Sequence, residues 1–414
     1  MSQKEIKVLS ITVFVAALGY FVDIYDLLLF NIVRVPSLKS MGVADFNKSG
    51  EYIIMIQMIG LLLGGIIWGI MGDKKGRLSV LFGSIILYST ANICNGFVHT
   101  VPQYALARFI AGIGLAGELG AGITLVSELL PKERRGIGTS MVAGIGLTGA
   151  IVAYFISQKF YWRQCYFIGG GLGFLLLFLR ITVFESGMYK SLHALPVARG
   201  NYFMFFSDKT RFRKYMLAIL IGLPTWYAIG ILIAFSNKFA KDMGITAEII
   251  PGKATMYAYV AISIGDVLVG FVSQWLKSRK KTLFIFYGLT AIAIGAYFMQ
   301  SNTGSASTMY WICAALGFGT GFWAIFVTMG AEQFGTNLRA TAATTIPNMV
   351  RGSLVLMLLL FNYLQHYFTY TQSGLITGVI VMIISIISNY FTEETFGKDL
   401  NYVEGDLAGD SLVK

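Results

Sequence analysis

The stretch from Arg108 to Arg135, RFIAGIGLAGELGAGITLVSELLPKERR, decides the fold class of this 414-residue chain. It places Arg108 and Glu118 inside an otherwise apolar segment that is rich in glycine. A charge at the centre of a bilayer-spanning helix costs roughly 2.5–3.5 kcal/mol on insertion scales. Charged residues in such a position usually serve a function, so the stretch predicts a membrane helix with a functional polar site.

The composition of the whole chain supports a membrane protein. Hydrophobic residues make up 56% of it and charged residues 13%, whereas soluble domains contain about 25% charged residues. The net charge of +11 does not indicate a nucleic-acid partner, because the basic residues form short clusters between apolar runs. The three cysteines and three histidines are scattered, which argues against a disulfide framework or a metal site.

Twelve apolar runs are long enough to cross a bilayer, which takes roughly 20 residues per helix. The first follows Lys4 and Lys7 and is too long for the hydrophobic part of a cleavable signal peptide. We therefore expect an all-α polytopic membrane protein. Its predicted spans are about 8–33, 50–72, 78–98, 103–127, 137–157, 164–183, 214–236, 254–276, 281–299, 307–331, 343–366 and 373–391.

The distribution of basic residues indicates how the chain is oriented. With an even number of spans both termini lie on one side, and the loops and tails of that side hold 22 of the 32 Lys and Arg residues. The loops of the other side hold eight. By the positive-inside rule the termini are cytoplasmic, and we expect a multi-pass protein of the bacterial inner membrane.

The longest polar interruption, residues 184–213, lies between the sixth and seventh spans and is basic. It divides the chain into an N-terminal six-helix bundle (1–183), a cytoplasmic linker, and a C-terminal six-helix bundle with a short tail (214–414). The sequence thus predicts two bundles of equal helix number.

A repeat across this division supports the two halves. Glu128 is followed seven residues later by Arg135, and 204 residues further on Glu332 is followed seven residues later by Arg339. Repeats at a fixed offset indicate duplicated structural units. We therefore expect two pseudo-symmetric bundles with a substrate site at their interface, as in transporters built from parallel repeats.

Four motifs resemble those of the major facilitator superfamily. GIMGDKKGR (69–77) is similar to its signature between the second and third helices, and RFIAGIG (108–114) to the arginine–glycine pattern of its fourth helix. SELLPKERRG (127–136) resembles a loop of its sugar, phosphate and metabolite proton symporters, and FVDIYDLLLF (21–30) resembles the first helix of its phosphate and metabolite symporters. The resemblance covers essentially the whole chain and implies transport by alternating access.

The candidate proton-coupling residues lie in the first and fourth helices. Asp23 and Asp26 are three residues apart and share a helix face, and two nearby carboxylates disfavour double ionisation. By the resemblance, Asp26 pairs with Arg108 as a protonation switch. Glu118 lies roughly 15 Å beyond Arg108 along the helix and is a second proton site or a substrate contact. The alternative is that some of these charges are salt bridges with no transport role.

The candidate substrate site lies in the second half. ATTIPNMVRG places Asn348 and Arg351 half-way along the eleventh span, and IGLPTWYAIG places Trp226 and Tyr227 half-way along the seventh. Helices interrupted by proline near the midplane mark substrate sites in transporters, and arginine suits a carboxylate or phosphate group. Asp266 of the eighth span is a further candidate contact. The alternatives are core packing for the aromatic pair and an Arg351–Asp266 ion pair.

Charged residues at helix ends form a candidate gate. By the resemblance they latch the cytoplasmic helix ends in the outward-open state, and the alternative is that they only determine topology. An exposed pair contributes about 0–1 kcal/mol, but a small bias can decide which state predominates. The first-half residues are Asp73, Arg77, Glu128 and Arg135, and the second-half residues are Glu332 and Arg339.

These features predict a secondary active transporter and not an enzyme. We expect proton-coupled symport, that is import, of a small anionic metabolite such as a carboxylate, with the proton gradient as energy source and no cofactor or metal. Its partners are then a small-molecule substrate, protons and the lipid bilayer, and the chain is a monomer. The alternatives are a proton-coupled exporter of drugs, cations or other small molecules, and a non-transporting sensor. The fifth helix lacks the Gly-Pro pair that resembles antiporter branches, which disfavours the exporter.

Overall fold

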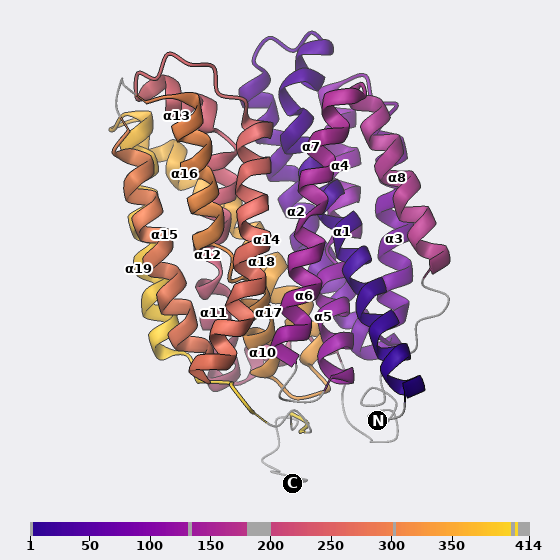
Figure 1. Cartoon of the computed structure of the whole chain (residues 1–414). Helices are drawn as coiled ribbons and strands as arrows, with labels where there is room; N and C mark the ends of the chain where they lie inside the picture. Colours follow the sequence, from indigo (N-terminus) through magenta and orange to yellow (C-terminus); the bar gives the residue numbers. More distant parts are fainter. Residues whose placement is uncertain (1–2, 131–134, 180–199, 301–303, 399–401, 405–414) are drawn as a thin grey trace.

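The structure, a computed structural model, describes residues 3–130, 135–179, 200–300, 304–398 and 402–404. The regular elements in these ranges are helices that run side by side, and both termini lie at the same end of the molecule (Figure 1). We call this end the terminal face and the other end the opposite face.

The twelve predicted spans are confirmed as helical segments long and apolar enough to cross a membrane. Several spans consist of two or three consecutive elements, because the helix is interrupted within them. The elements of the first half are α1 (Gln3–Ser40), α2 (Phe46–Lys75), α3 (Arg77–Asn95), α4 (Val101–Leu115), α5 (Glu118–Leu129), α6 (Arg135–Leu147), α7 (Gly149–Lys159) and α8 (Trp162–Leu179).

The second half begins with a short helix next to the seventh span. Its elements are α10 (Met204–Ser207), α11 (Lys209–Ile221), α12 (Leu223–Tyr227), the π-helix η2 (Ala228–Ile233), α13 (Ser236–Asp242), α14 (Pro251–Leu276), α15 (Arg279–Phe298), α16 (Ala306–Gly319), α17 (Trp323–Glu332), α18 (Arg339–Leu364) and α19 (Tyr370–Phe391).

Figure 1 shows the two halves as neighbouring groups of helices, with α1 to α8 on one side and α11 to α19 on the other. The predicted all-α fold with two six-helix bundles is therefore confirmed. The linker boundaries, 184–213, stay a prediction, because residues 180–199 lie outside the described part of the chain.

Glycine allows the closest helix contacts. A Cβ on Gly60 of α2 would lie 2.3 Å from the carbonyl oxygen of Phe109 in α4, and a Cβ on Gly112 of α4 would lie 2.5 Å from the carbonyl oxygen of Gln57 in α2. Neither position has room for a side chain, so α2 and α4 pack backbone against backbone, as small residues permit in membrane helices.

The first span is longer than predicted. Its helix passes through Pro36 and ends at Ser40, not near residue 33. Proline does not end this helix because neighbouring groups in a packed membrane protein can satisfy the backbone that proline frees.

Candidate functional site

Arg351 is a buried cation with two aromatic neighbours. Its side chain is 1% exposed, and its guanidinium carbon lies 5.9 Å from the ring centre of Trp226 and 5.8 Å from that of Trp323. Nη1 donates to Oδ1 of Asn348 at 3.1 Å, whereas Nε has no hydrogen-bond partner among the described residues. A guanidinium with an unused donor suits an anionic ligand.

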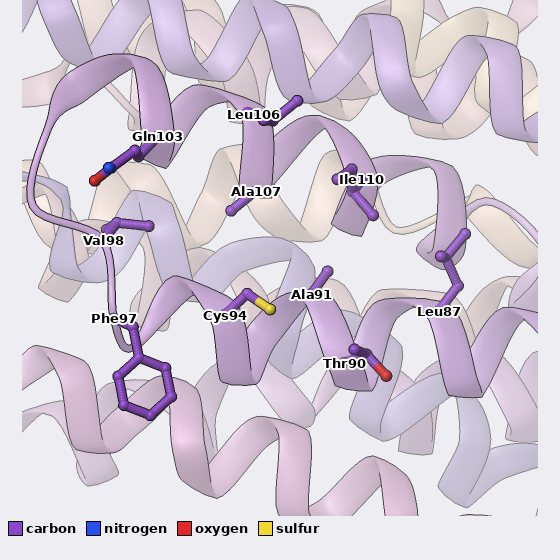
Figure 2. A pocket seen from close by; sticks show the side chains of 10 residues that line it. All are labelled: Leu87, Thr90, Ala91, Cys94, Phe97, Val98, Gln103, Leu106, Ala107 and Ile110. Carbon is purple, nitrogen blue, oxygen red and sulfur yellow. The ribbon is translucent and has the colours of Figure 1, made fainter.

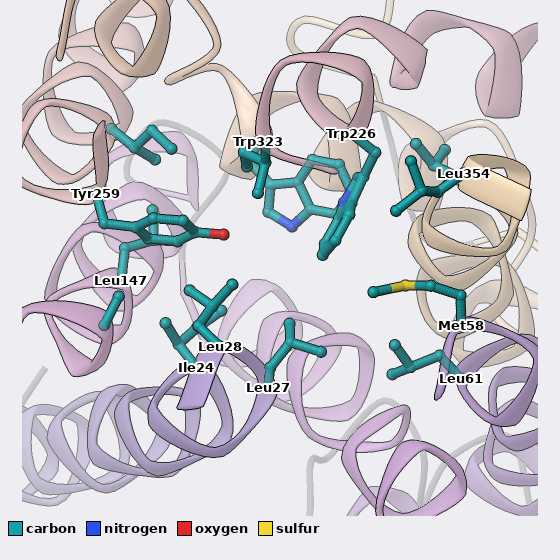
Figure 3. Packing of buried hydrophobic residues seen from close by; sticks show 14 of the residues in the cluster. Ile24, Leu27, Leu28, Met58, Leu61, Leu147, Trp226, Tyr259, Trp323 and Leu354 are labelled. Atoms are coloured by element: carbon teal, nitrogen blue, oxygen red, sulfur yellow. The ribbon is translucent and has the colours of Figure 1, made fainter. Parts of the chain in front are cut away.

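Apolar and aromatic side chains of both bundles meet near the two tryptophans. Figure 3 shows the rings of Trp226 and Trp323 directed toward a region bordered by Leu27 and Leu28 of α1, with the hydroxyl of Tyr259 pointing the same way. Tyr259 also interacts electrostatically with Arg351. The residues come from both bundles, so the arrangement lies at the bundle interface, where the repeat predicts the substrate site.

Helix interruptions position the two tryptophans. Trp226 lies in α12, a five-residue segment that follows the break at Gly222, and Trp323 is the first residue of α17, just after the tenth span is interrupted. Oδ1 of Asp266 accepts from the backbone N–H of Ala324 at 2.9 Å and so caps the start of α17. Among the described residues, Asp266 makes no ion pair with Arg351. Its hydrogen bond holds the start of α17, where Trp323 lies.

Tyr227 is not brought together with Arg351. Its hydroxyl donates to the carbonyl of Gly374 in α19 at 2.6 Å, inside the C-terminal bundle. Trp323 and Tyr259, by contrast, were not identified from the sequence. Trp323 could have been found from its place after the glycines of GFGTGFW, which interrupt the tenth span as proline interrupts the seventh.

The structure also brings together Asp26 and Arg108, the predicted proton-coupling pair. The hydrogen bond between them ends on the Asp26 backbone and not on its carboxylate. Nη1 of Arg108 donates to the backbone carbonyl of Asp26 at 3.1 Å and Nη2 to Oδ1 of Asn92 at 2.7 Å, while the ring of Tyr166 lies 5.2 Å from the guanidinium. The Asp26 side chain is fully buried, and Arg108 and Asn92 are its polar neighbours. Asp23 is fully buried one turn earlier.

Glu118 occupies a separate position, as its spacing from Arg108 predicts. It is the first residue of α5, and its Oε1 accepts from the hydroxyl of Ser84 in α3 at 2.8 Å. A carboxylate at a helix N-terminus is favoured by the helix dipole. The structure therefore places Glu118 at the interruption of the fourth span, away from the Arg108 cluster.

Asp73 joins the two bundles near the terminal face. Its oxygens accept from the backbone N–H groups of Ala340 (3.2 Å) and Thr341 (2.8 Å) and from the Thr341 hydroxyl (2.6 Å). These groups belong to the first turn of α18, so a residue of the first half caps a helix of the second. Arg77 lies 3.5 Å from Asp73 and donates to the carbonyl of Gly72.

The second-half gate residues have other partners. Glu332 accepts two hydrogen bonds of 2.7 Å from Arg279, a residue not singled out in the sequence, and both side chains are buried. Arg339 is fully buried at the start of α18. The backbone at Glu128 and Arg135 belongs to α5 and α6, but their side chains lie outside the described part of the structure.

Contacts also join the bundles at the opposite face. Nη2 of Arg34 in α1 donates to the carbonyl of Ala234 at 2.9 Å, and its guanidinium lies 4.6 Å from the ring centre of Phe235. Nδ2 of Asn362 in α18 donates to Glu51 in α2. Since Asp73 joins the bundles at the other end, polar contacts hold the two bundles together at both faces.

Comparison with protein families identifies the architecture. The sequence model of the Major Facilitator Superfamily matches residues 9–356. The chain belongs to this superfamily. It is accordingly a multi-pass membrane transporter and not an enzyme.

Proteins named as transporters are similar to this chain over most of its length. The niacin transporter NiaP of Acinetobacter baylyi is 26% identical over 427 residues, covering 94% of this chain and 95% of that protein. The benzoate transport protein of the same species is 24% identical over 361 residues, covering 77% and 75%. The proton:xylose symporter XylE, solved with 6-bromo-6-deoxy-D-glucose, matches with a TM-score of 0.77 at 18% identity, covering 95% of this chain and 98% of that one.

This superfamily member also has a groove of about 390 Å³ between α3 and α4 (Figure 2). No charged side chain lines it, and it includes Leu106, which is 60% exposed on the outer surface of the bundle. Apolar side chains on the outside of a membrane helix face lipid. The groove therefore belongs to the lipid-facing surface and lacks the groups that would bind an anionic substrate.

Proposed function

We propose that this protein is a proton-coupled importer of a small aromatic monocarboxylate. The observation that carries the proposal is the buried Arg351 between Trp226 and Trp323, with its Nε unused. The guanidinium would bind the carboxylate, and the indole faces would hold an aromatic ring. The names of two relatives, a niacin transporter and a benzoate transport protein, support this substrate class.

Proton coupling is proposed for Asp26 and Arg108. Protonation of the Asp26 carboxylate would remove the negative charge that Arg108 faces from α4, and so would weaken the attraction between the first and fourth spans. This weaker attraction would shift the balance between the inward-open and outward-open conformations, and a small shift is enough for alternating access. Asp23 and Glu118 are proposed as further ionisable groups on the same pathway.

The rest of the proposal concerns the orientation in the membrane, the oligomeric state, the energy source and the direction of transport. We place the terminal face in the cytoplasm of a bacterial cell because 22 of the 32 Lys and Arg residues lie on that side. The chain would work as a monomer, with the proton gradient as its energy source and without a cofactor. An exporter of cations is disfavoured, since Arg351 already occupies the position between the tryptophans and would repel a cationic substrate.

The test is uptake into proteoliposomes. Purified protein is reconstituted, and accumulation of radiolabelled nicotinate and benzoate is measured with and without an imposed pH gradient, acidic outside. We expect accumulation that requires the gradient and collapses with a protonophore. Arg351→Lys keeps the charge but not the planar set of donors, and we expect it to weaken nicotinate binding by about tenfold.

The controls separate the parts of the proposal. Lys241→Gln, at an exposed residue of the opposite face, should transport as wild type does. Equal uptake with and without the gradient would remove the proton claim. Binding of neither carboxylate, with a folded protein by size exclusion, would remove the substrate claim.

A further inference from the structure

The side-chain amide of Asn348 has no donor left for a substrate. Asn348 lies one helical turn before Arg351 on α18, and its Nδ2 donates to the carbonyls of Ala116 at 2.8 Å and Thr344 at 2.7 Å. Its Oδ1 accepts from Nη1 of Arg351 at 3.1 Å. A primary amide has two N–H donors. These contacts therefore indicate a task other than direct binding of substrate.

The bond to Ala116 connects the two bundles at a break. Ala116 follows the last residue of α4, and α5 begins at Glu118. Carbonyl groups at the end of a helix lack partners within it. A residue of the second half thus supplies a hydrogen bond to the interruption in the fourth span, on the helix that also carries Arg108.

There is little space in which Asn348 could move alone. A Cβ on Gly65 of α2 would lie 2.7 Å from Cβ of Asn348, and a Cβ on Gly120 of α5 would meet Thr344. Packed protein interiors transmit displacements because they contain few voids. A shift of Asn348 must therefore be accompanied by a shift of α2 or α5.

We infer that Asn348 is a positioning residue that couples anion binding at Arg351 to release of the α4–α5 break, and so to movement of the bundles. The inference rests on the proposed carboxylate site. A carboxylate bound at the unused Nε draws the guanidinium toward itself and away from Oδ1 of Asn348, which lengthens the hydrogen bond from Nη1 to Oδ1. Once Oδ1 is released, the amide is held less firmly and its bond to Ala116 weakens. Anion binding then favours the conformation in which the bundles part.

The transport test uses two matched variants with nicotinate as the probe. Asn348→Ala removes the coupling, whereas Thr345→Val alters a buried residue of the same helix whose hydroxyl donates to Thr341 in that helix. For Asn348→Ala we expect a nicotinate Kd within about threefold of wild type and a net uptake kcat lowered by about tenfold. Thr345→Val should change neither.

Two results would overturn the inference. A Kd raised by about tenfold with unchanged kcat would make Asn348 a substrate ligand. Equal turnover in Asn348→Ala and Thr345→Val would remove any coupling role. If Asn348→Ala does not fold, Gly65→Ala displaces Asn348 from the other bundle, and the same separation of Kd from kcat is expected.

A ligand-free measurement separates this inference from the proposed substrate. Spin labels at Lys75→Cys and Lys281→Cys, exposed residues of α2 and α15 near the terminal face, report the distance between the bundles in a Cys94→Ser background. Without substrate, Asn348→Ala should shift the distance distribution toward longer values relative to Thr345→Val. Unchanged distances would contradict the coupling, even in a protein that neither binds nor carries nicotinate.

Discussion

Arg279 and Glu332 form a two-bond ion pair near the terminal face. Nε and Nη2 of Arg279 each donate to one oxygen of Glu332 at 2.7 Å, and the two side chains are 4% and 7% exposed. This fork geometry is the strongest that an arginine and a carboxylate can adopt. The pair links the start of α15 to the end of α17 within the second half.

Removal of one partner of this pair should destabilise the protein strongly. Arg279→Ala leaves a buried carboxylate uncompensated, which costs about 3–5 kcal/mol. We expect an apparent melting temperature lower by about 5 °C or more in detergent. The double variant Arg279→Met with Glu332→Leu should recover most of the loss. Lys214→Ala, from the more exposed pair with Glu393, is the control and should change little.

The crossing of α2 and α4 gives a prediction about packing. Gly60→Ala places a methyl group 2.3 Å from the Phe109 carbonyl, and overpacking of this kind costs roughly 1–3 kcal/mol. Gly122→Ala on α5 has nothing within 4 Å of the new Cβ and serves as the matched control. Thermal unfolding should show a lower midpoint for Gly60→Ala and a midpoint within error of wild type for Gly122→Ala. Equal midpoints would contradict the close crossing.

Loss of the Asp73 carboxylate should open the terminal face. Asp73→Asn removes the charge that caps α18 and keeps one acceptor oxygen, so we expect a loss of about 1 kcal/mol, a roughly fivefold shift toward the open state. The measurement is the rate at which N-ethylmaleimide modifies Thr344→Cys in a Cys94→Ser background. Asp45→Asn, which removes the charge but not the acceptor of the α2 cap at the opposite face, should leave that rate unchanged.

The C-terminal segment gives a prediction about pH. Burial raises the pKa of Glu394, but hydrogen bonds from Ser278 and from the backbone N–H groups of Arg279, Phe396 and Lys280 outweigh it and hold the pKa below its ordinary value of 4.5. A carboxyl whose pKa is lowered by folding stabilises the protein above pH 4.5 and loses that contribution as the pH falls through its folded pKa.

Glu394→Gln should therefore be less stable than wild type at pH 7, by only about 0.5–1 kcal/mol because the side chain is partly buried and partly in contact with water. The difference in melting temperature should shrink as the pH is lowered below 4.5. Glu248→Gln, at an exposed residue, is the control. A Glu394→Gln difference that stays constant from pH 7 to the acid limit of the fold would refute the linkage.

Trp323 should act through its aromatic face. Trp323→Leu removes the ring beside Arg351, and we expect nicotinate binding to weaken by about fivefold, equivalent to roughly 1 kcal/mol. Trp323→Phe keeps a ring and should bind within about twofold of wild type. Isothermal titration measures both, and Trp311→Leu, a residue 66% exposed on the outer surface, is the control. Weakening in Trp311→Leu alone would place the ligand elsewhere.

The sequence could predict the features that depend on local pattern. The twelve spans follow from apolar runs, because a bilayer fixes both the length and the polarity of a spanning helix. Arg351 and Trp226 both lie about half-way along spans that contain proline, and so at a similar depth; the structure places them 5.9 Å apart, although α18 runs unbroken through Pro347. The depth of a residue in the membrane follows from its distance in sequence from the end of its span.

The direction of a side chain around its helix was harder to predict. Tyr227 adjoins Trp226 in sequence, yet bonds to α19 on the other side of its helix. Trp323 lies beside Arg351 from α17, and Tyr259 of α14 interacts with it electrostatically. Glu332 pairs with Arg279, 53 residues away. These contacts depend on how helices rotate and pack, which periodicity alone does not fix in segments that are apolar on most sides.

Three of the polar contacts between helices end on main-chain oxygens: Arg34 on Ala234, Asn348 on Ala116 and Arg108 on Asp26. A carbonyl is present whatever the side chain, so each of these contacts constrains the sequence at only one of its two positions. Related sequences compared position by position would then show no correlated substitutions for these pairs. Methods that infer contacts from such correlations would overlook these bonds, two of which join the two halves, and alanine scanning would detect them only from the Arg34, Asn348 and Arg108 ends.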